Sequence, residues 1–235
     1  MTLDTLLLAG GAEFGEPMSE PDLRALELAG GPEAPVRIIP AAAAPDHNHI
    51  RAGENGARWF RELGARDVQV VYAIDRPSAD DPAVAAALAA ARLVYLLGGF
   101  PRHLAKTLAG SRAWEAVLSA YRSGAVIAGS SAGAMVLCDH YYDPYERSLL
   151  PGLGLIPDAC VLPHHATMGL RWLPMLSKEL PDSLLIGIDE STAMIRQQGT
   201  WTVYGGGRVT LYPASPGQPR ISTVYASGDS FILPG

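Results

Sequence analysis

Short apolar runs alternate with helical patterns along the first 138 residues, and this alternation restricts the fold more than any other feature. Each run is four or five mostly apolar residues long, which is typical of strands buried on both faces. The predicted strands are residues 6–9, 36–39, 68–72, 93–97 and 125–128, and the predicted helices are residues 21–29, 49–63, 82–91 and 111–123. Because short strand–helix connections produce right-handed crossovers, we expect an α/β fold with a mostly parallel central sheet flanked by helices.

The pattern changes after Cys138. Residues 139–151 are polar and aromatic without periodicity, so we expect a loop there. Strand-like runs follow at residues 159–162 and 184–189. From Ala193 onward, β-like runs separated by Gly and Pro predict C-terminal hairpins. These runs are residues 193–197, 201–204, 208–212, 223–226 and 231–233. No linker or shift in composition divides the chain, and we expect a single α/β domain over residues 1–235.

Composition and charge exclude several classes of protein. Apolar residues make up 48% of the chain and charged residues 18%, which excludes a disordered chain. The net charge is −6 and no basic run occurs, which argues against a nucleic-acid partner. The longest uncharged stretch, residues 123–138, is too short and too rich in Ser and Gly to span a bilayer. Residues 1–8 resemble a first strand rather than a signal peptide, and two cysteines cannot form a disulfide framework. We therefore expect a cytoplasmic protein without a membrane partner.

The segment Gly129-Ser130-Ser131-Ala132-Gly133 matches the pattern G-x-S-x-G, directly after a predicted strand and before a helical pattern. In this context a sharp strand-to-helix turn raises the serine hydroxyl above the edge of the sheet, where it can act as a nucleophile. The same residues could form a plain turn of small side chains, but the order strand, turn and helix favours the nucleophile. Ser131 is therefore the candidate nucleophile.

A glycine pair, Gly98-Gly99, follows the preceding predicted strand. Ligand sites of open parallel sheets collect at the carboxyl ends of the strands. The N–H group of Gly99 could pair there with that of Ala132 and form an oxyanion hole. Taken alone, the glycine pair fits an ordinary turn almost as well.

A serine nucleophile needs a base, which is usually histidine. His164 and His165 follow the strand-like run at residues 159–162, so a ring could project from that strand end toward Ser131. His47 and His49 could bind a metal, but the sequence indicates no third ligand. The other histidines are His103, on a helical pattern, and His140, soon after the predicted elbow helix.

Five ordered motifs resemble the cyanophycinase and dipeptidase E (aspartyl dipeptidase) family of serine peptidases, which has a class I glutamine amidotransferase-like fold. The motifs are Gly98-Gly99, residues 129–134, residues 152–155, Pro163-His164 and residues 187–193. The resemblance implies that Ser131 is the nucleophile and His164 the base. Glutamine amidotransferases proper carry cysteine at the elbow, so a serine at this position implies a hydrolase.

The resemblance also implies an acid that orients the histidine, in the loop between the elbow helix and His164. Glu146 fits the spacing of the dipeptidase branch best and is the prediction. Asp143 and Asp139 are alternatives in the same loop. Glu190, in the motif at residues 187–193, could also approach the site or could belong to a turn network.

The implied activity is hydrolysis of short peptides, with an acidic residue or a β-linked aspartyl bond, and without a metal or organic cofactor. In relatives, an acidic or amide residue follows the glycine pair, often with a glutamine or threonine next, whereas this chain has Phe100-Pro101 there. Cyanophycinases also carry several arginines soon after the histidine, and this chain retains only Arg171. We expect Phe100, Arg171 and Glu190 to contact the substrate.

Two alternative functions are open. One is a serine hydrolase that acts on a non-peptide amide or ester, and the other is a non-catalytic binding protein with the same fold. The apolar C-terminal region could bury the interface of a homodimer.

Overall fold

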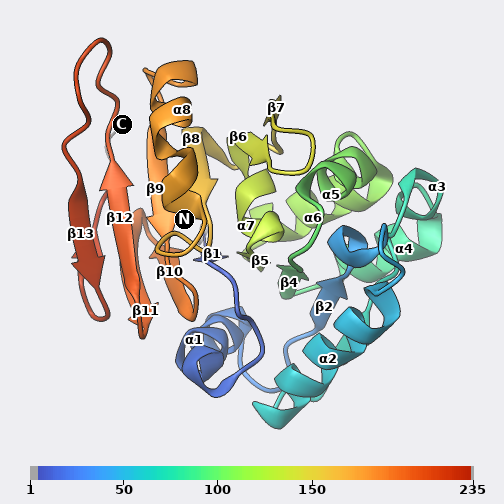
Figure 1. Cartoon of the computed structure of the whole chain (residues 1–235). Coiled ribbons are helices and arrows are strands. Elements are labelled where there is room, and N and C mark those ends of the chain that lie inside the picture. Colours follow the sequence, from blue (N-terminus) through green and yellow to red (C-terminus); the bar gives the residue numbers. More distant parts are fainter. Residues whose placement is uncertain (1–4, 234–235) are drawn as a thin grey trace.

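The computed structural model describes residues 5–233 and contains two β-sheets (Figure 1). The first half of the chain supplies a parallel set of strands in the larger sheet, and later strands extend that sheet in antiparallel fashion. The eight strands lie in the order β14 (Ser230–Phe231), β11 (Thr200–Gly205), β10 (Thr192–Gln197), β1 (Leu6–Ala9), β5 (Val126–Ser130), β4 (Leu93–Leu96), β2 (Val36–Ile39) and β3 (Val68–Val70). The expected α/β fold with a mostly parallel central sheet is confirmed.

A second sheet of six strands lies at the opposite side of the molecule from α2 (His49–Glu62) in Figure 1. Its strands lie in the order β13 (Thr223–Ala226), β12 (Arg208–Tyr212), β9 (Leu184–Ile188), β8 (Ile156–Leu162), β6 (Cys138–Asp143) and β7 (Ser148–Pro151). β8 is parallel to both β6 and β9. The sequence patterns predicted several of these strands but not their assembly into a separate sheet.

The prediction of a loop at residues 139–151 is wrong, because this segment forms the antiparallel hairpin β6–β7. Tyr141 and Asp143 are buried there, whereas His140 and Tyr142 are only partly covered. Polar residues at buried positions conceal the hydrophobic alternation by which a strand is usually found, although tyrosine itself favours strands.

Helices cover the larger sheet, and the four predicted helices are present with shifts of up to two residues at their ends. The remaining α-helices are α1 (Ser19–Ala29), α3 (Arg76–Ala79), α4 (Pro82–Ala89), α5 (Pro101–Leu108), α6 (Arg112–Arg122), α7 (Ala132–Val136) and α8 (Leu173–Glu179), and the 3₁₀ turns are η1 (Glu16–Met18), η2 (Ala41–Ala43) and η3 (Gly169–Trp172). Asp81 and Ser111 cap α4 and α6 through side-chain oxygens that accept backbone N–H groups. Within residues 5–233, no helix has both the length and the apolar composition needed to cross a membrane.

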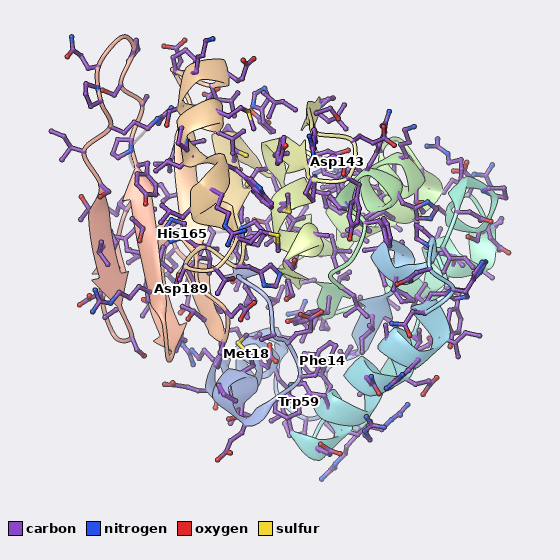
Figure 2. The ribbon with its side chains drawn as sticks, in the orientation of Figure 1. Phe14, Met18, Trp59, Asp143, His165 and Asp189 are labelled. Carbon is purple, nitrogen blue, oxygen red and sulfur yellow. The ribbon has the colours of Figure 1, made fainter. Side chains whose placement is uncertain are left out.

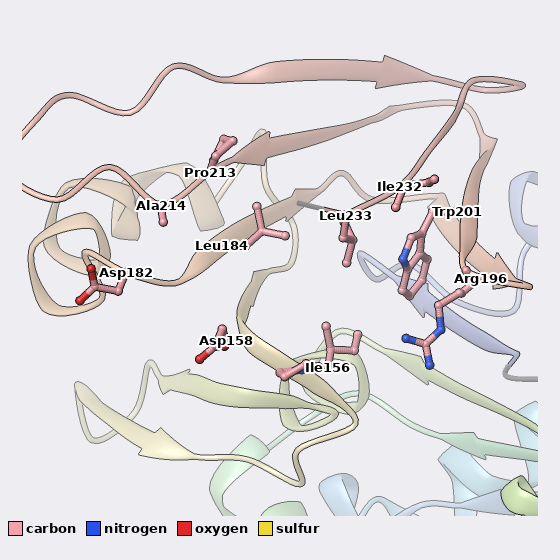
Figure 3. A pocket seen from close by; sticks show the side chains of 12 residues that line it. Ile156, Asp158, Asp182, Leu184, Arg196, Trp201, Pro213, Ala214, Ile232 and Leu233 are labelled. Atoms are coloured by element: carbon pink, nitrogen blue, oxygen red, sulfur yellow. The ribbon is translucent and has the colours of Figure 1, made fainter. Parts of the chain in front are cut away.

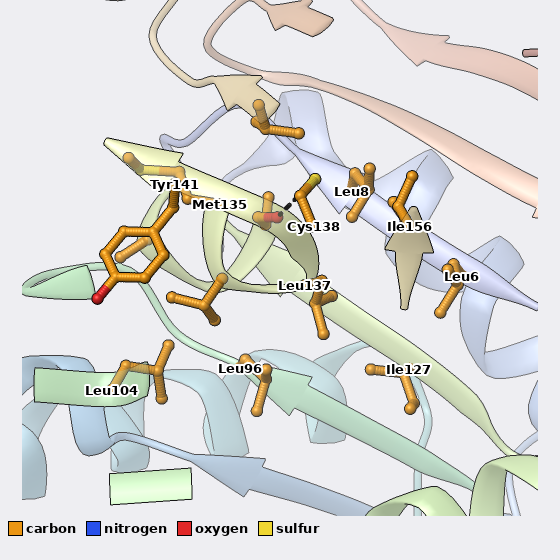
Figure 4. Close-up of a cluster of buried hydrophobic side chains, with 14 of the residues drawn as sticks. Leu6, Leu8, Leu96, Leu104, Ile127, Met135, Leu137, Cys138, Tyr141 and Ile156 are labelled. Carbon is orange, nitrogen blue, oxygen red and sulfur yellow. Dashed lines mark hydrogen bonds between the residues drawn. The ribbon is translucent and has the colours of Figure 1, made fainter. Parts of the chain in front are cut away.

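The larger sheet is buried on both faces. Along β1, Leu6 and Leu8 join one hydrophobic cluster, whereas Leu7 and Ala9 join another. The first cluster contains side chains of both sheets and of helices α4 to α6, and it includes Ile156 of β8 (Figure 4). Because successive side chains of a strand point to opposite faces, an uninterrupted apolar strand requires cover on both sides.

Glycines allow α7 to pack closely against β4 and β5. A Cβ built on Gly133 would lie 2.2 Å from the carbonyl oxygen of Leu96, and one built on Gly129 would lie 2.5 Å from the carbonyl carbon of Gly133. Real side chains do not tolerate such distances, so these two positions must remain glycine. This packing fixes where the chain turns at Ser131, between β5 and α7.

Replacing Gly133 with alanine should lower the free energy of unfolding by about 1–3 kcal/mol, because α7 must move away from the backbone of β4. Gly206→Ala is the control, since a Cβ there meets no atom within 4 Å. The control should change stability by less than about 0.5 kcal/mol. Urea denaturation followed by tryptophan fluorescence measures both variants, and equal stabilities would contradict the close packing.

A buried carboxyl group lies between α1 and α2. The Asp22 side chain is fully buried, and its Oδ2 atom accepts a hydrogen bond from Trp59 Nε1 at 2.8 Å. Its Oδ1 atom has no hydrogen-bond partner among the described residues. Trp59, Phe14 and Met18 gather in this part of Figure 2. Burial raises the pKa of Asp22 from 3.8 to about 7, against the opposing effect of the Trp59 hydrogen bond, and the charge of Glu13 adds to the rise.

The raised pKa of Asp22 predicts a pH-dependent stability. The folded protein holds this proton up to about pH 7, whereas the unfolded chain releases it near pH 3.8, so stability falls as the pH rises through this interval. Asp22→Asn keeps an acceptor for Trp59 and removes the titration. The stability of the variant relative to the wild type should therefore rise by about 1 kcal/mol per pH unit within the interval and become constant above about pH 8. Urea denaturation over this pH range tests it, and a constant difference would contradict the assignment.

Candidate active site

Ser131 lies at the turn between β5 and α7 with an uncommon backbone conformation. Its φ and ψ angles are 48° and −111°, a combination that non-glycine residues rarely adopt. Its N–H group donates to Ala9 O at 2.9 Å, and its carbonyl accepts from Met135 N at 3.0 Å. The Ser131 side chain is partly exposed, whereas the preceding Ser130 is fully buried. These features are those expected of a nucleophile elbow, and they distinguish Ser131 from its neighbour.

The His164 ring lies against the Ser131 hydroxyl. The distance from Ser131 Oγ to His164 Nε2 is 2.9 Å, and the distance from His164 Nδ1 to Glu190 Oε1 is 2.7 Å. A ring with its proton on Nδ1 donates to Glu190 and leaves Nε2 free to accept the serine proton, so the hydrogen-bond network assigns this tautomer. Serine, histidine and carboxylate are thus connected in the order required for general-base activation.

Glu190, not Glu146, is the carboxylate that contacts the histidine. Glu146 instead forms an ion pair with Arg102 at 3.4 Å. The structure therefore does not place Glu146, the predicted orienting acid, on the histidine. The alternatives in the same segment are also engaged elsewhere, since Asp143 Oδ1 accepts Tyr145 N–H and Asp139 Oδ2 accepts Asp158 N–H.

The sheet topology explains this difference. β8 and β9 are parallel neighbours, so the residues that follow them meet at one edge of the sheet. His164 follows β8 and Glu190 follows β9. The sequence contained this signal, because both strands had been predicted and each is followed by a residue able to transfer or bind a proton. The hairpin β6–β7 directs Glu146 toward α5 instead.

The His165 ring contacts Tyr212 and Asp189 instead of Ser131. Its Nε2 atom lies 3.1 Å from the Tyr212 hydroxyl, and its Nδ1 atom lies 3.6 Å from Asp189 Oδ1. Burial lowers the pKa of His165, against the opposing effect of Asp189. Figure 2 shows His165 and Asp189 near each other. Of the two adjacent histidines, only His164 lies within hydrogen-bond distance of Ser131.

The loop after β1 contacts the two segments that carry His164 and Glu190. This β1 loop comprises residues 10–15. Gly10 O accepts the N–H group of His164 at 2.8 Å, and Gly11 O accepts that of Ser191 at 3.0 Å. Gly11 has a φ of 117°, and a Cβ there would lie 2.2 Å from His164 Cε1. The contact between these glycines and the histidine is a long-range contact, and no sequence pattern predicted it.

The predicted oxyanion donors are Gly99, which follows β4, and Ala132, the residue after Ser131. Within residues 5–233, the N–H groups of Gly98, Gly99 and Ala132 have no hydrogen-bond acceptor. A Cβ built on Gly98 would lie 3.2 Å from Ser131 Cβ, whereas one on Gly99 would lie 2.3 Å from Ala42 O. Gly98 is thus a third candidate donor beside the predicted Gly99 and Ala132.

Of the residues predicted to contact substrate, Phe100 and Arg171 lie on different elements. The Phe100 ring stacks on Tyr145, with the ring centroids 4.4 Å apart. Both rings line a pocket of about 580 Å³ together with Arg102, His103, Lys106, Asp143 and Glu146. Arg171 lies exposed on η3 and forms no ion pair with a described residue.

Figure 3 shows a second pocket, of about 600 Å³, whose lining does not include Ser131, His164 or Glu190. Its lining includes Leu184 of β9, Arg196 of β10 and Trp201 of β11.

The described part of the chain contains no group of three or more His, Cys, Asp or Glu residues that could hold a metal ion. The pair His47 and His49 thus lacks a third ligand of these types there.

Comparisons with known proteins identify the family. The model of peptidase family S51 matches residues 6–204. A cyanophycinase from Trichormus variabilis is 32% identical over 222 residues, which cover 89% of this chain and 74% of that protein. A cyanophycinase from Geminocystis herdmanii is 30% identical over 220 residues, which cover 88% of this chain and 79% of that protein.

Two solved structures are similar in fold. A peptidase from an acI-B1 Actinobacterium superposes with a TM-score of 0.82 at 27% identity, over 98% of this chain and 97% of that one. A putative peptidase E protein from Listeria monocytogenes, at 17% identity, shares the fold with a TM-score of 0.65 over 87% of this chain and 100% of that one. Together with the sequence matches, these similarities confirm the predicted relationship to cyanophycinases and dipeptidase E: the chain is a peptidase and belongs to peptidase family S51.

Proposed function

We propose that this protein is a serine peptidase that hydrolyses short peptides through Ser131, His164 and Glu190. The observation that carries the proposal is the continuous pair of hydrogen bonds, 2.9 Å from Ser131 Oγ to His164 Nε2 and 2.7 Å from His164 Nδ1 to Glu190 Oε1. Serine alone is a weak nucleophile at neutral pH, and an adjacent oriented imidazole is the usual means of activating it.

In the proposed reaction, Ser131 Oγ attacks the carbonyl carbon of the peptide while its proton passes to His164 Nε2. The Glu190 carboxylate holds the ring in its tautomer and stabilises the imidazolium that forms. The oxyanion of the tetrahedral intermediate accepts hydrogen bonds from N–H groups of Gly98, Gly99 and Ala132. His164 then protonates the leaving amine, and a water molecule, activated by the same ring, releases the acyl group from Ser131.

The proposed substrate class rests on similarity and on one exposed basic residue, Arg171. The relatives named cyanophycinase support a substrate with an acidic residue or a β-linked aspartyl bond. Arg171 is exposed seven residues after His164 and has no ion-pair partner among the described residues, so it could bind a substrate carboxylate. Phe100, which stands where relatives carry an acidic or amide residue, stacks on Tyr145 and would present an aromatic surface to the substrate.

A dipeptide panel tests the proposed activity. The wild-type protein should hydrolyse at least one member without added metal. Ser131→Ala should lower kcat by at least about 10³-fold, because it removes the nucleophile. Ser130→Ala is the control at the neighbouring residue and should retain more activity than Ser131→Ala. Equal background rates for the wild type and Ser131→Ala would end the proposal, and labelling of Ser131 by a fluorophosphonate without peptide cleavage would favour an esterase or amidase.

The identity of the acid is tested by two glutamine substitutions. Glu190→Gln should lower kcat by about 10²- to 10⁴-fold, because the amide no longer stabilises the imidazolium and can impose the wrong ring tautomer. Glu146→Gln is the matched control and should keep kcat within about threefold, since Glu146 contacts Arg102 and not the histidine. The reverse order of effects, with the loss in Glu146→Gln, would contradict the assignment.

A further inference from the structure

The pocket of Figure 3 is lined by residues of both sheets and takes no part in the proposed reaction. Trp201 belongs to β11 of the larger sheet, whereas Ile156 and Leu184 are the first residues of β8 and β9 in the smaller one. His164 and Glu190 follow the other ends of β8 and β9. The pocket and the candidate active site therefore lie at opposite ends of the same two strands.

The size and lining of this pocket are those of a site for a small molecule. Its volume is about 600 Å³, and ligand pockets commonly enclose about 300–1,000 Å³. Apolar side chains form most of the lining, and some come from late segments of the chain, such as Pro213 after β12 and Leu233 after β14. Ile232 of the lining is 75% exposed. An apolar ligand would remove part of this surface from water, which favours binding.

The charged groups of the lining are two carboxylates and one guanidinium group. Arg196 donates to the Tyr121 hydroxyl at 2.7 Å, and its Cζ atom lies 5.6 Å from the centroid of the Trp201 ring. Asp158 and Asp182 are exposed, and neither forms an ion pair within residues 5–233. Figure 3 shows both carboxylates on the side of the pocket away from Arg196. That side is therefore negatively charged.

We infer that this pocket binds a small organic cation, namely an ammonium group attached to an apolar body. The ammonium group donates charge-assisted hydrogen bonds to Asp158 and Asp182. The apolar body lies against Ile156, Leu184 and Ile232. An anionic ligand would meet two like charges on the acidic side, and a neutral one would gain only the apolar contacts. The inference goes beyond the proposed function and does not depend on it, because binding in this pocket needs no turnover.

Three probes with the same phenylethyl body test the inference. Phenethylamine carries a cation, phenethyl alcohol carries no charge, and hydrocinnamate carries an anion. Titration of the wild-type protein, followed by the NMR signals of each probe, measures the three dissociation constants. The amine should bind about tenfold more tightly than the alcohol, because hydrogen bonds between charged groups are stronger than neutral ones. Hydrocinnamate should bind most weakly.

Variants of the lining locate the binding. The double variant Asp158→Asn, Asp182→Asn should bind the amine and the alcohol equally, with the affinity for the alcohol unchanged. Asp46→Asn is the matched control, since Asp46 is exposed and does not line the pocket, and it should keep the tenfold preference. Ala214→Phe enlarges an exposed side chain of the lining and should weaken both probes by at least about threefold.

Three results would overturn the inference. One is equal affinity of the wild type for the amine and the alcohol, and another is an undiminished preference in the double aspartate variant. The third is loss of amine binding in Glu190→Gln, which would place the amine in the candidate active site. Thermal unfolding reports whether each variant is folded, and it provides a second measure of binding. The amine should raise the Tm of the wild type, because it binds only the folded protein, and should raise that of the double variant less.

Failure of the dipeptide panel would leave these binding measurements unaffected. The pocket and the proposed peptidase activity are thus tested separately.

Discussion

The hydrogen bond between Ser131 and His164 joins the two sheets of the molecule, and the arrangement of the candidate site depends on it. Ser131 follows β5 of the larger sheet, whereas His164 follows β8 of the smaller one. The two side chains meet only because the carboxyl ends of these strands face the same space. The Oγ to Nε2 distance of 2.9 Å therefore depends on the packing between the sheets as well as on the local turn.

The β1 loop joins these parts of the site. It lies between the segments that carry His164 and Glu190, and it accepts a backbone N–H group from each segment. Gly11 leaves no room for a side chain above the His164 ring, and Glu13 contacts the residue before the nucleophile. One short segment thus contacts His164, the turn that carries Glu190 and the residue before Ser131. The β1 loop therefore packs closely against the candidate site, although none of Ser131, His164 and Glu190 belongs to it.

The sequence was sufficient to predict the strand–helix order and the sharp turn at Ser131, because both depend on local patterns. Buried parallel strands have apolar runs, and the turn needs small residues at Gly129 and Gly133 on either side of the serine. The choice of His164 over His165 came from the family resemblance. Glu190 was among the candidate acids, but local patterns could not select it over Glu146. The position of the acid depends on which strand neighbours β8, and the parallel pairing with β9 is a long-range contact that brings Glu190 to His164. Spacing along the chain favoured Glu146, which the β6–β7 hairpin places near Arg102. That hairpin was itself missed because polar residues at its buried positions conceal the alternation.

The hydrogen-bond network assigns His164 a proton on Nδ1, donated to Glu190, and an unprotonated Nε2 atom that faces Ser131. Nitrogen-15 NMR of ring-labelled histidine distinguishes the two neutral tautomers directly. In mildly alkaline buffer, the His164 signals should show the proton on Nδ1, coupled through the hydrogen bond to Glu190, and an unprotonated Nε2. A His164 ring with its proton on Nε2, or one that exchanges freely between both forms, would contradict the account.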